Sequence, residues 1–204
     1  MAYRSVVTLN TPIYDFATKK KLTDEEARKL PTLKNVAVLP KAFNESGEPI
    51  AYYLVHDVKK GARFDISKYY NQPEKGKKFP PFIAYSFSGR KISSSGQGKI
   101  LVLNFLISFD HSILQKEKFR KFLNIVNEDV NFTPVVFSLS GKEEAKLFSK
   151  DNNLSLPIVT NAQSFSQKYG IHNFPSYIVV DKEGICAGVF SDVDELKRAL
   201  EQLK

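Results

Sequence analysis

The chain has 204 residues, 42% of them hydrophobic, which is enough to bury one large core or one domain with an appendage. Its formal net charge of +8 lies entirely in residues 1–98, because residues 99–204 carry 13 basic and 13 acidic side chains. No stretch approaches the roughly 20 apolar residues of a membrane-spanning helix. The sequence also lacks the dense arginine cluster with interleaved aromatic residues that a nucleic-acid-binding module would need. We therefore expect neither a transmembrane segment nor a nucleic-acid partner.

The basic side chains of the first half form short groups, namely KKK at residues 19–21, KK at 59–60 and EKGKK at 74–78. Such short, scattered groups are typical of a solvated lysine face. The alternative is contact with an acidic partner or membrane surface through screened long-range attraction.

The first predicted elements are a short helix and a hairpin. In TDEEARKL, Thr23 precedes Glu26 by three residues, which is the capping-box pattern, and the helix should end before Pro31. The runs NVAVLPKAF and IAYYLVHDV then predict two strands joined by the turn-forming NESGEP. Residues 59–81 show no clear period and predict a connector. We expect a small basic α+β segment at 1–78 and a second domain at 79–204.

The second domain opens with a predicted strand pair in FIAYSFSGRKISSS, which turns at Ser88-Gly89. The near-continuous apolar run GKILVLNFLI is typical of a strand buried on both faces. An amphipathic helix follows, with an inner stripe at i, i+3, i+4 and i+7 formed by Phe119, Phe122, Leu123 and Val126.

The rest of the chain alternates between strands and helices. The strands are predicted in FTPVVFSLS, LPIVT, PSYIVVD and ICAGVF, and the helices in KEEAKLFSK, NAQSFSQKYG and the final segment from Val193 to Leu203. This order indicates an α/β fold with a central mixed sheet and helices on both faces. The hairpin around DKEG adds an antiparallel edge strand.

The order of these elements resembles the thioredoxin fold, in particular the TlpA/ResA-type branch related to the alkyl hydroperoxide reductase and thiol-specific antioxidant (AhpC/TSA) proteins. The resemblance covers about residues 79–204. Its most diagnostic part is YGIHNFPSYIVVDKEG, similar to the family's YG-x-x-x-P-T-x-x-x-x-D-x-x-G. The resemblance implies that Phe174-Pro175 is a cis peptide facing the active-site turn. The N-terminal zone also resembles an appendage of some bacterial envelope proteins of this branch.

The family's redox motif is W-C-x-x-C at the start of the first long helix. Laid over NFLISFDHSIL, the resemblance puts Phe109 at the tryptophan position, Asp110 and Ile113 at the two cysteine positions, and His111 and Ser112 between them. Because both sulfurs are missing, we expect no dithiol mechanism and no catalytic residue. Cys186 is the only cysteine and should lie across the sheet from the helix start.

Asp110, His111 and Ser112 leave other hypotheses open. Asp110 is a good residue for a helix N-cap, where its carboxylate would accept backbone N–H groups. Alternatively, Asp110, His111 and His172 would converge on a metal, although no recognised ligand spacing supports this. A Ser-His-Asp relay is poorer, because adjacent residues at a helix start point in different directions. We therefore expect no metal and no cofactor.

The loop with Pro175 is the better functional candidate. In thioredoxin-like proteins the backbone beside this proline pairs with an extended peptide by strand addition, which needs no sulfur. Phe109 and Phe174 would form apolar walls of the groove, with His111 and His172 at its rim. In the alternative, Pro175 only shapes a turn and the aromatic rings belong to the core.

The sequence thus predicts a redox-inactive thioredoxin-like protein that binds a protein or peptide. The rival hypothesis is an enzyme related to the thiol-disulfide oxidoreductases and peroxiredoxins with an unconventional site, dependent on Cys186 or on a metal. The N-terminal MAYRSVVTLNTP lacks the apolar region of a secretory signal. A cytoplasmic protein and a periplasmic or envelope protein with its signal removed therefore both remain open.

Overall fold

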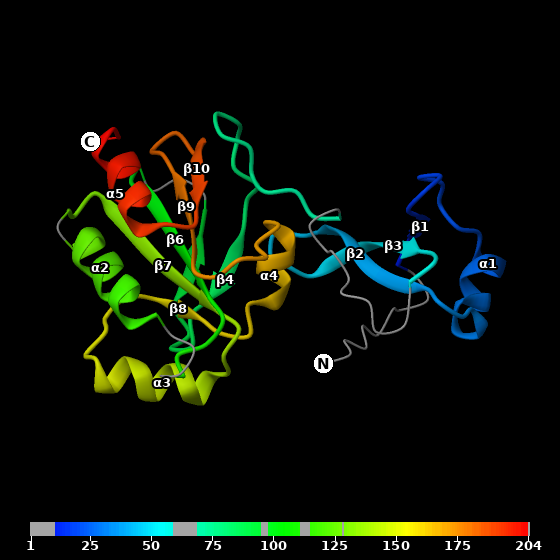
Figure 1. Ribbon diagram of the computed structural model, residues 1–204, viewed down its shortest axis with the longest axis horizontal. Coiled ribbons are helices and arrows are strands. Elements are labelled where there is room, and N and C mark those ends of the chain that lie inside the picture. Colours follow the sequence, from blue (N-terminus) through cyan, green and yellow to red (C-terminus); the bar gives the residue numbers. More distant parts are fainter. Residues whose placement is uncertain (1–10, 59–68, 95–97, 111–114, 128, 204) are drawn as a thin grey trace. The chain divides into compact units, whose positions relative to one another are not determined.

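A computed structural model describes residues 11–58, 69–94, 98–110, 115–127 and 129–203 (Figure 1). The chain divides into two compact units. The smaller comprises Met1–Asn44 and Glu48–Tyr70, and the larger comprises Asn71–Lys204 with Glu45–Gly47. Each is described by itself.

The smaller unit contains a three-stranded sheet. The predicted hairpin is present as β2 (Ala37–Phe43) and β3 (Pro49–Val55), which pair antiparallel. A third strand, β1 (Ile13–Asp15), pairs parallel with β3 and gives the order β1-β3-β2. The sequence did not predict β1, because three residues are too few to show alternation.

The predicted capping box opens α1 (Asp24–Lys29). The Glu26 N–H donates to Thr23 Oγ1 at 3.3 Å, and the Thr23 N–H donates to Glu26 Oε2 at 2.7 Å. These two bonds satisfy backbone donors that the first helical turn leaves without partners. As expected, α1 ends before Pro31, which lies in a short 3-10 turn.

The larger unit is built on a five-stranded mixed sheet of order β10-β9-β6-β7-β8. Its strands are β6 (Ile100–Leu106), β7 (Phe132–Ser138), β8 (Ile158–Val159), β9 (Ser176–Val180) and β10 (Cys186–Phe190). The strands β6, β7 and β8 run parallel, whereas β9 and β10 are antiparallel to their neighbours. The antiparallel edge strand predicted after DKEG is thus present.

Both faces of this sheet are covered. On one face pack α2 (Lys116–Asn127), α3 (Lys142–Asp151) and α5 (Val193–Glu201), which contribute to one apolar core. On the other lie α4 (Gln163–Lys168) and the separate hairpin of β4 (Ile83–Tyr85) and β5 (Lys91–Ser93), which contribute to a second core (Figure 1). The predicted α/β class with a central mixed sheet is confirmed.

The strand β6 lies between β7 and β9, and all seven of its residues are buried. Its side chains alternate between the two cores, so that Val102 packs under the helices and Leu103 packs on the hairpin side. The predicted inner stripe of α2 also faces the core, since Phe119, Phe122 and Val126 are buried. This central strand fixes the positions of the chain segments at both of its ends.

Leu196 and Leu147 form a matched pair for testing the core. Leu196 of α5 is 0% exposed, whereas Leu147 of α3 is 62% exposed. We expect Leu196→Ala to lower the free energy of unfolding by about 3 kcal/mol, because the substitution leaves a cavity. Leu147→Ala should change it by less than about 0.5 kcal/mol. Urea unfolding of both variants measures this, and equal losses would contradict the assigned packing.

Candidate functional site

The segment that the sequence singles out lies directly after β6. The residues Ile107, Ser108, Phe109 and Asp110 follow the last residue of that strand. Because β6 and β7 are parallel, the chain after β7 leaves the sheet at the same edge. This topology brings the first turn of α3 next to the segment, which we call the 107–110 loop.

A single carboxylate oxygen holds the 107–110 loop in place. Glu144 Oε1, in the first turn of α3, accepts the Ser108 hydroxyl at 2.6 Å and the Phe109 backbone N–H at 2.7 Å. The Ser140 hydroxyl donates to the same oxygen at 2.7 Å. Ser108 Oγ in turn accepts the Asp110 N–H at 2.9 Å. One side chain thereby joins the two strand ends.

The environment of Glu144 favours its ionised form. Partial burial acts to raise the pKa of this carboxyl group, but the hydrogen bonds from Ser108, Ser140 and the backbone N–H groups of Phe109 and Asp110 outweigh burial and lower the pKa. Hydrogen bonds to an ionised acceptor are stronger than those between neutral groups. The 107–110 loop is thus anchored by a fixed negative charge.

Glu144 and Ser140 were not predicted as site residues from the sequence. Glu144 lies 36 residues beyond Ser108, so no local pattern connects them. A usable signal was nevertheless present, since Glu144 opens a helix that follows a strand predicted beside the central one. A polar residue at such a place reaches the carboxyl edge of a parallel sheet.

The ring of Phe109 belongs to the core. It is 3% exposed, stacks on Phe148 at a centroid distance of 4.6 Å and contacts Phe119 edge-on at 6.4 Å. Of its two predicted roles, core residue and wall of an open groove, this burial favours the core. The exposed apolar side chain of the loop is Ile107, which is 43% exposed.

Residues 172–175, which we call the proline loop, lie against the 107–110 loop. The Phe174-Pro175 peptide is cis, Pro175 is buried and Phe174 is half-buried. A small cavity of about 30 Å³ is lined by both segments, including Ile107, Ser108, Phe174 and Pro175. The structure therefore brings together the two loops that the sequence singled out separately.

Two buried polar side chains lie on neighbouring strands beneath this region. Asn104 of β6 and Tyr177 of β9 are register partners, and both are 0% exposed. The Asn104 amide and the Tyr177 hydroxyl have no hydrogen-bond partner among the described residues. Tyr177 also lines the small cavity, whose volume suffices for a water molecule. The sequence analysis took Asn104 as part of an apolar strand.

The other predicted site residues are only partly described. His111, Ser112 and Ile113 lie outside the described residues. Asp110 is exposed, and α2 is described from Lys116, so the role of Asp110 as an N-cap stays a prediction. His172 is half-buried. Within the described ranges, no group of three or more His, Cys, Asp or Glu side chains is arranged to hold a metal.

Cys186 lies at the far end of the sheet. It is 1% exposed, and its neighbour on β9 is Val180, which pairs with Leu101 near the start of β6. Burial raises the pKa of its thiol, and the charge of Asp181 adds to this rise. A protonated, buried thiol is a poor nucleophile.

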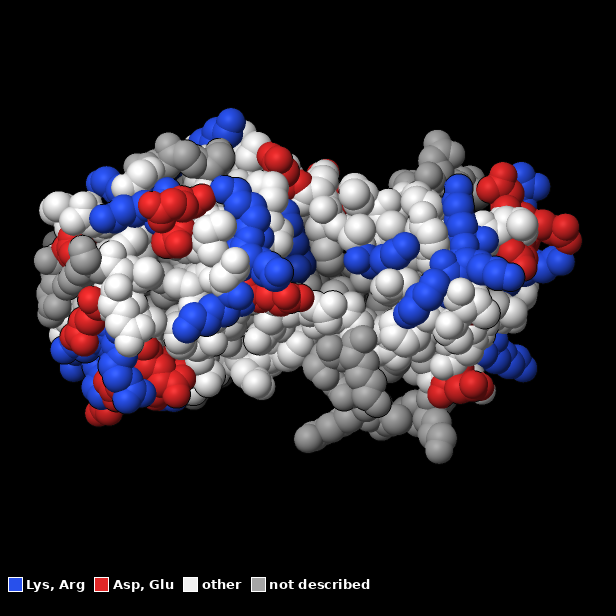
Figure 2. Space-filling model, turned by 90° about the horizontal axis from the view of Figure 1, so that it is seen from above, with Lys and Arg blue, Asp and Glu red and all other residues white. Residues whose placement is uncertain are grey.

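The basic side chains show no single dense patch in Figure 2, where lysines and arginines are scattered among acidic and uncharged residues on the face in view. In the smaller unit, Lys41 lies over the Tyr14 ring at 3.2 Å and Lys19 over the Phe16 ring at 3.6 Å. Some of the lysines of the smaller unit therefore interact with aromatic rings of the same unit. None of the helices in the described part of the chain is long and apolar enough to cross a bilayer.

No protein-family model and no curated protein matches the sequence. Solved structures do match. One is the C-terminal domain of a protein assigned as a thiol-disulfide oxidoreductase from Bacteroides thetaiotaomicron, with 25% identity and a TM-score of 0.54, covering 64% of this chain and 95% of that one. Another is a thiol-disulfide oxidoreductase from Bacteroides fragilis, with 23% identity and a TM-score of 0.52, covering 63% of this chain and 100% of that one.

A third similar structure is a peroxiredoxin-like protein from Aquifex aeolicus, with 17% identity and a TM-score of 0.56, covering 65% of this chain and 89% of that one. These likenesses confirm the predicted resemblance to thioredoxin-like proteins at the level of the fold. They cover about two thirds of the chain.

We expect the hydrogen bonds of Glu144 to stabilise the fold in a pH-dependent way. Glu144→Gln should lower the free energy of unfolding by about 1–2 kcal/mol at neutral pH, a value reduced for solvent screening at this partly exposed group. The folded-state pKa is lowered, so the ionised anchor stabilises the fold fully above the ordinary pKa of 4.5. This contribution is lost as the pH falls through the folded-state pKa.

Urea unfolding between about pH 7 and about pH 3 measures the difference between wild type and Glu144→Gln, which should shrink on acidification. The matched control is Glu143→Gln, which changes the adjacent, exposed carboxylate of the same helix. A pH-independent difference, or an equal effect of Glu143→Gln, would argue against the anchor.

Proposed function

We propose that this protein binds an extended peptide segment of a partner beside Phe174-Pro175 and does not exchange disulfides. The observation that carries this proposal is that the thiol of Cys186 lies far from the 107–110 loop. Cys186 is the only cysteine of the chain, and it lies near the opposite end of β6 from the 107–110 loop. Leu101 and Leu106 are five residues apart, which corresponds to about 17 Å along a strand.

Disulfide exchange needs an accessible thiolate and, in the family's mechanism, a second thiol one turn away. The single thiol here is buried, and its pKa is raised mainly by that burial. At the positions where the resemblance puts the two cysteines, this chain has Asp110 and Ile113. The residues present therefore support binding over redox chemistry.

The backbone beside the proline is available for strand addition. Neither the N–H nor the C=O of Phe174 makes a hydrogen bond within the described part of the chain. The exposed Ile107 side chain and the half-buried Phe174 ring both line the small cavity. Free backbone groups flanked by apolar side chains are what an added strand requires for affinity and specificity.

The hydrogen bonds of Glu144 to the 107–110 loop also support this proposal. They fix the Phe109 N–H and the Ser108 hydroxyl, so one wall of the groove is preorganised before a peptide arrives. A preformed site loses less conformational entropy on binding than a mobile one.

The absence of redox activity is tested by the reduction of insulin with dithiothreitol. The wild-type protein should not accelerate the reaction, whereas the double variant Asp110→Cys/Ile113→Cys should, because it places thiols at the two positions that the resemblance assigns to the redox pair. In that reaction the variant dithiol becomes a disulfide while an insulin disulfide is reduced, and dithiothreitol regenerates the dithiol.

The matched control is the single variant Asp110→Cys, which lacks the resolving thiol and should turn over poorly. Clear turnover by the wild-type protein would refute the proposal. An inactive double variant with an unchanged circular dichroism spectrum would show that the two positions do not correspond to the redox pair.

Peptide binding is tested with twelve-residue peptides selected from a random phage-displayed library on the immobilised wild-type protein. Ile107→Asp should weaken the selected peptides by about tenfold, because it places a charge beside the apolar groove. Leu147→Asp is the matched control, as it changes another exposed aliphatic residue of the same unit. Failure to enrich any peptide, or equal binding to both variants, would count against the groove.

A further inference from the structure

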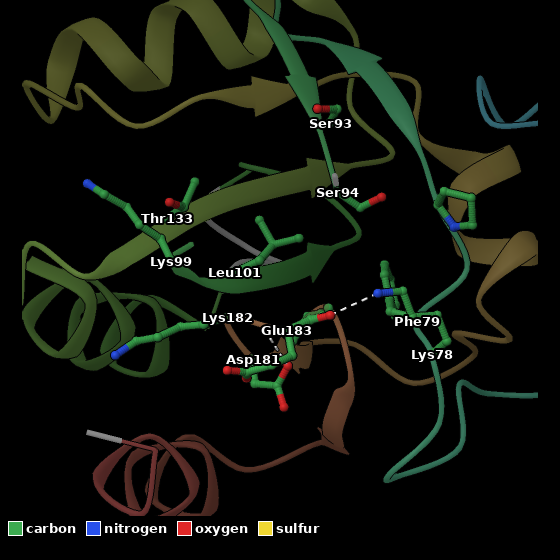
Figure 3. Close-up of a pocket in the computed structure, with 13 residues that line it drawn as sticks. Lys78, Phe79, Ser93, Ser94, Lys99, Leu101, Thr133, Asp181, Lys182 and Glu183 are labelled. Atoms are coloured by element: carbon green, nitrogen blue, oxygen red, sulfur yellow. Dashed lines mark hydrogen bonds between the residues drawn. The ribbon is translucent and has the colours of Figure 1, made fainter. Parts of the chain in front are cut away.

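A second recessed site lies at the other end of the central sheet. A pocket of about 460 Å³ opens beside the beginning of β6, between the segment that leads into β4, the end of β5 and the turn after β9 (Figure 3). Its volume falls within the roughly 300–1,000 Å³ that small-molecule sites occupy. No part of the 107–110 loop or the proline loop lines it.

The floor of this pocket is a row of side chains across three strands. Leu101 of β6 pairs in register with Thr133 of β7 on one side and with Val180 of β9 on the other. Leu101 and Val180 are 7% and 1% exposed, and Phe79, which adds a wall, is 4% exposed. The floor is thus apolar and rigid, with the Thr133 hydroxyl at its edge.

Three lysines lie on the rim. Lys99 and Lys182 lie along the same side of the pocket in Figure 3, with their ammonium groups at its outer edge, and Lys78 lies on the opposite side. Lys78 Nζ donates to the Glu183 carbonyl at 2.8 Å, and Lys99 Nζ donates to the Val130 carbonyl at 2.9 Å, so both bind neutral oxygens. Lys182 makes no hydrogen bond or ion pair with the described residues.

Two carboxylates also line the rim, but one of them is engaged. Asp181 Oδ1 accepts the Glu183 and Ile185 backbone N–H groups at 3.0 and 2.8 Å and thereby builds the turn. Glu183 is exposed to solvent. The side that carries Lys99 and Lys182 therefore holds two positive charges without a carboxylate bound to either.

We propose that this pocket binds a small carboxylic acid with an apolar tail, of the medium-chain fatty acid class. The tail would lie on Leu101, Val180 and Phe79, where its burial from water supplies the attraction. The carboxylate would lie at the outer edge of the pocket, on the side of Lys99 and Lys182, with the Thr133 hydroxyl as a further donor. A neutral molecule of the same shape would gain no attraction from the two lysines, so we expect the site to favour the acid.

This site is independent of the peptide groove. Leu101 lies near the start of β6 and the 107–110 loop follows its end, so the two sites are separated by the length of the strand. Failure of either proposal leaves the other standing.

The experiment is a titration of the full chain with sodium octanoate, followed by two-dimensional ¹⁵N–¹H NMR. We expect saturable shifts of the backbone signals of Thr133, Val180, Asp181 and Gly184, while the Ile107 and Phe174 signals stay in place. Octan-1-ol, the neutral comparison, should bind about tenfold more weakly. The double variant Lys99→Gln/Lys182→Gln should bind octanoate about tenfold more weakly than wild type.

Two further variants complete the test. Lys146→Gln removes an exposed lysine of α3 outside the pocket and should bind octanoate as wild type does. Thr133→Trp should abolish binding by filling the pocket, provided that its circular dichroism spectrum and melting temperature match wild type. The proposal is overturned if octanoate shifts no signal, if the shifts cluster outside the pocket, or if the lysine double variant binds as tightly as wild type.

Discussion

The burial of β6 on both faces is the constraint on which the larger unit depends. All seven residues of this strand are buried, and it pairs with β7 on one side and β9 on the other. A one-residue shift of this strand would exchange its side chains between the two cores and break the packing on both faces, so two ladders and two cores hold its register. Whatever is attached to its two ends is therefore held rigidly, and both sites that we propose lie at those ends.

At the carboxyl end of β6, the charged side chain of Glu144 holds the 107–110 loop in place by hydrogen bonds. Glu144 Oε1 receives donors from the 107–110 loop and from Ser140, which follows β7. The loop thus keeps a defined conformation although it has no cysteine pair to shape it.

The two ends of β6 offer different chemistry. The carboxyl end presents the exposed Ile107 side chain and the half-buried Phe174 ring next to free backbone groups of Phe174, which would suit an extended peptide. The amino end presents an apolar floor below lysines, which suits a small anion with an apolar body. The two proposed sites share no lining residue, so binding at one would not compete with binding at the other for the same side chains.

Much of the fold was determined by local sequence patterns. The capping box at Thr23 and Glu26, the apolar run of β6 and the stripe of α2 were visible because each depends on residues within a few positions of one another. The sequence alone also shows that the chain has a single cysteine and so no Cys-x-x-Cys motif, and the resemblance marked Phe174-Pro175. Local patterns could not show the rest.

Only the tertiary structure decided that Glu144 anchors a loop 36 residues away, that Phe109 is buried on Phe148, and that Leu101, Thr133 and Val180 form one floor. The physical reason is that these contacts depend on which strands become neighbours and in which register. Sheet order and register are properties of the whole core, and no short stretch of sequence records them.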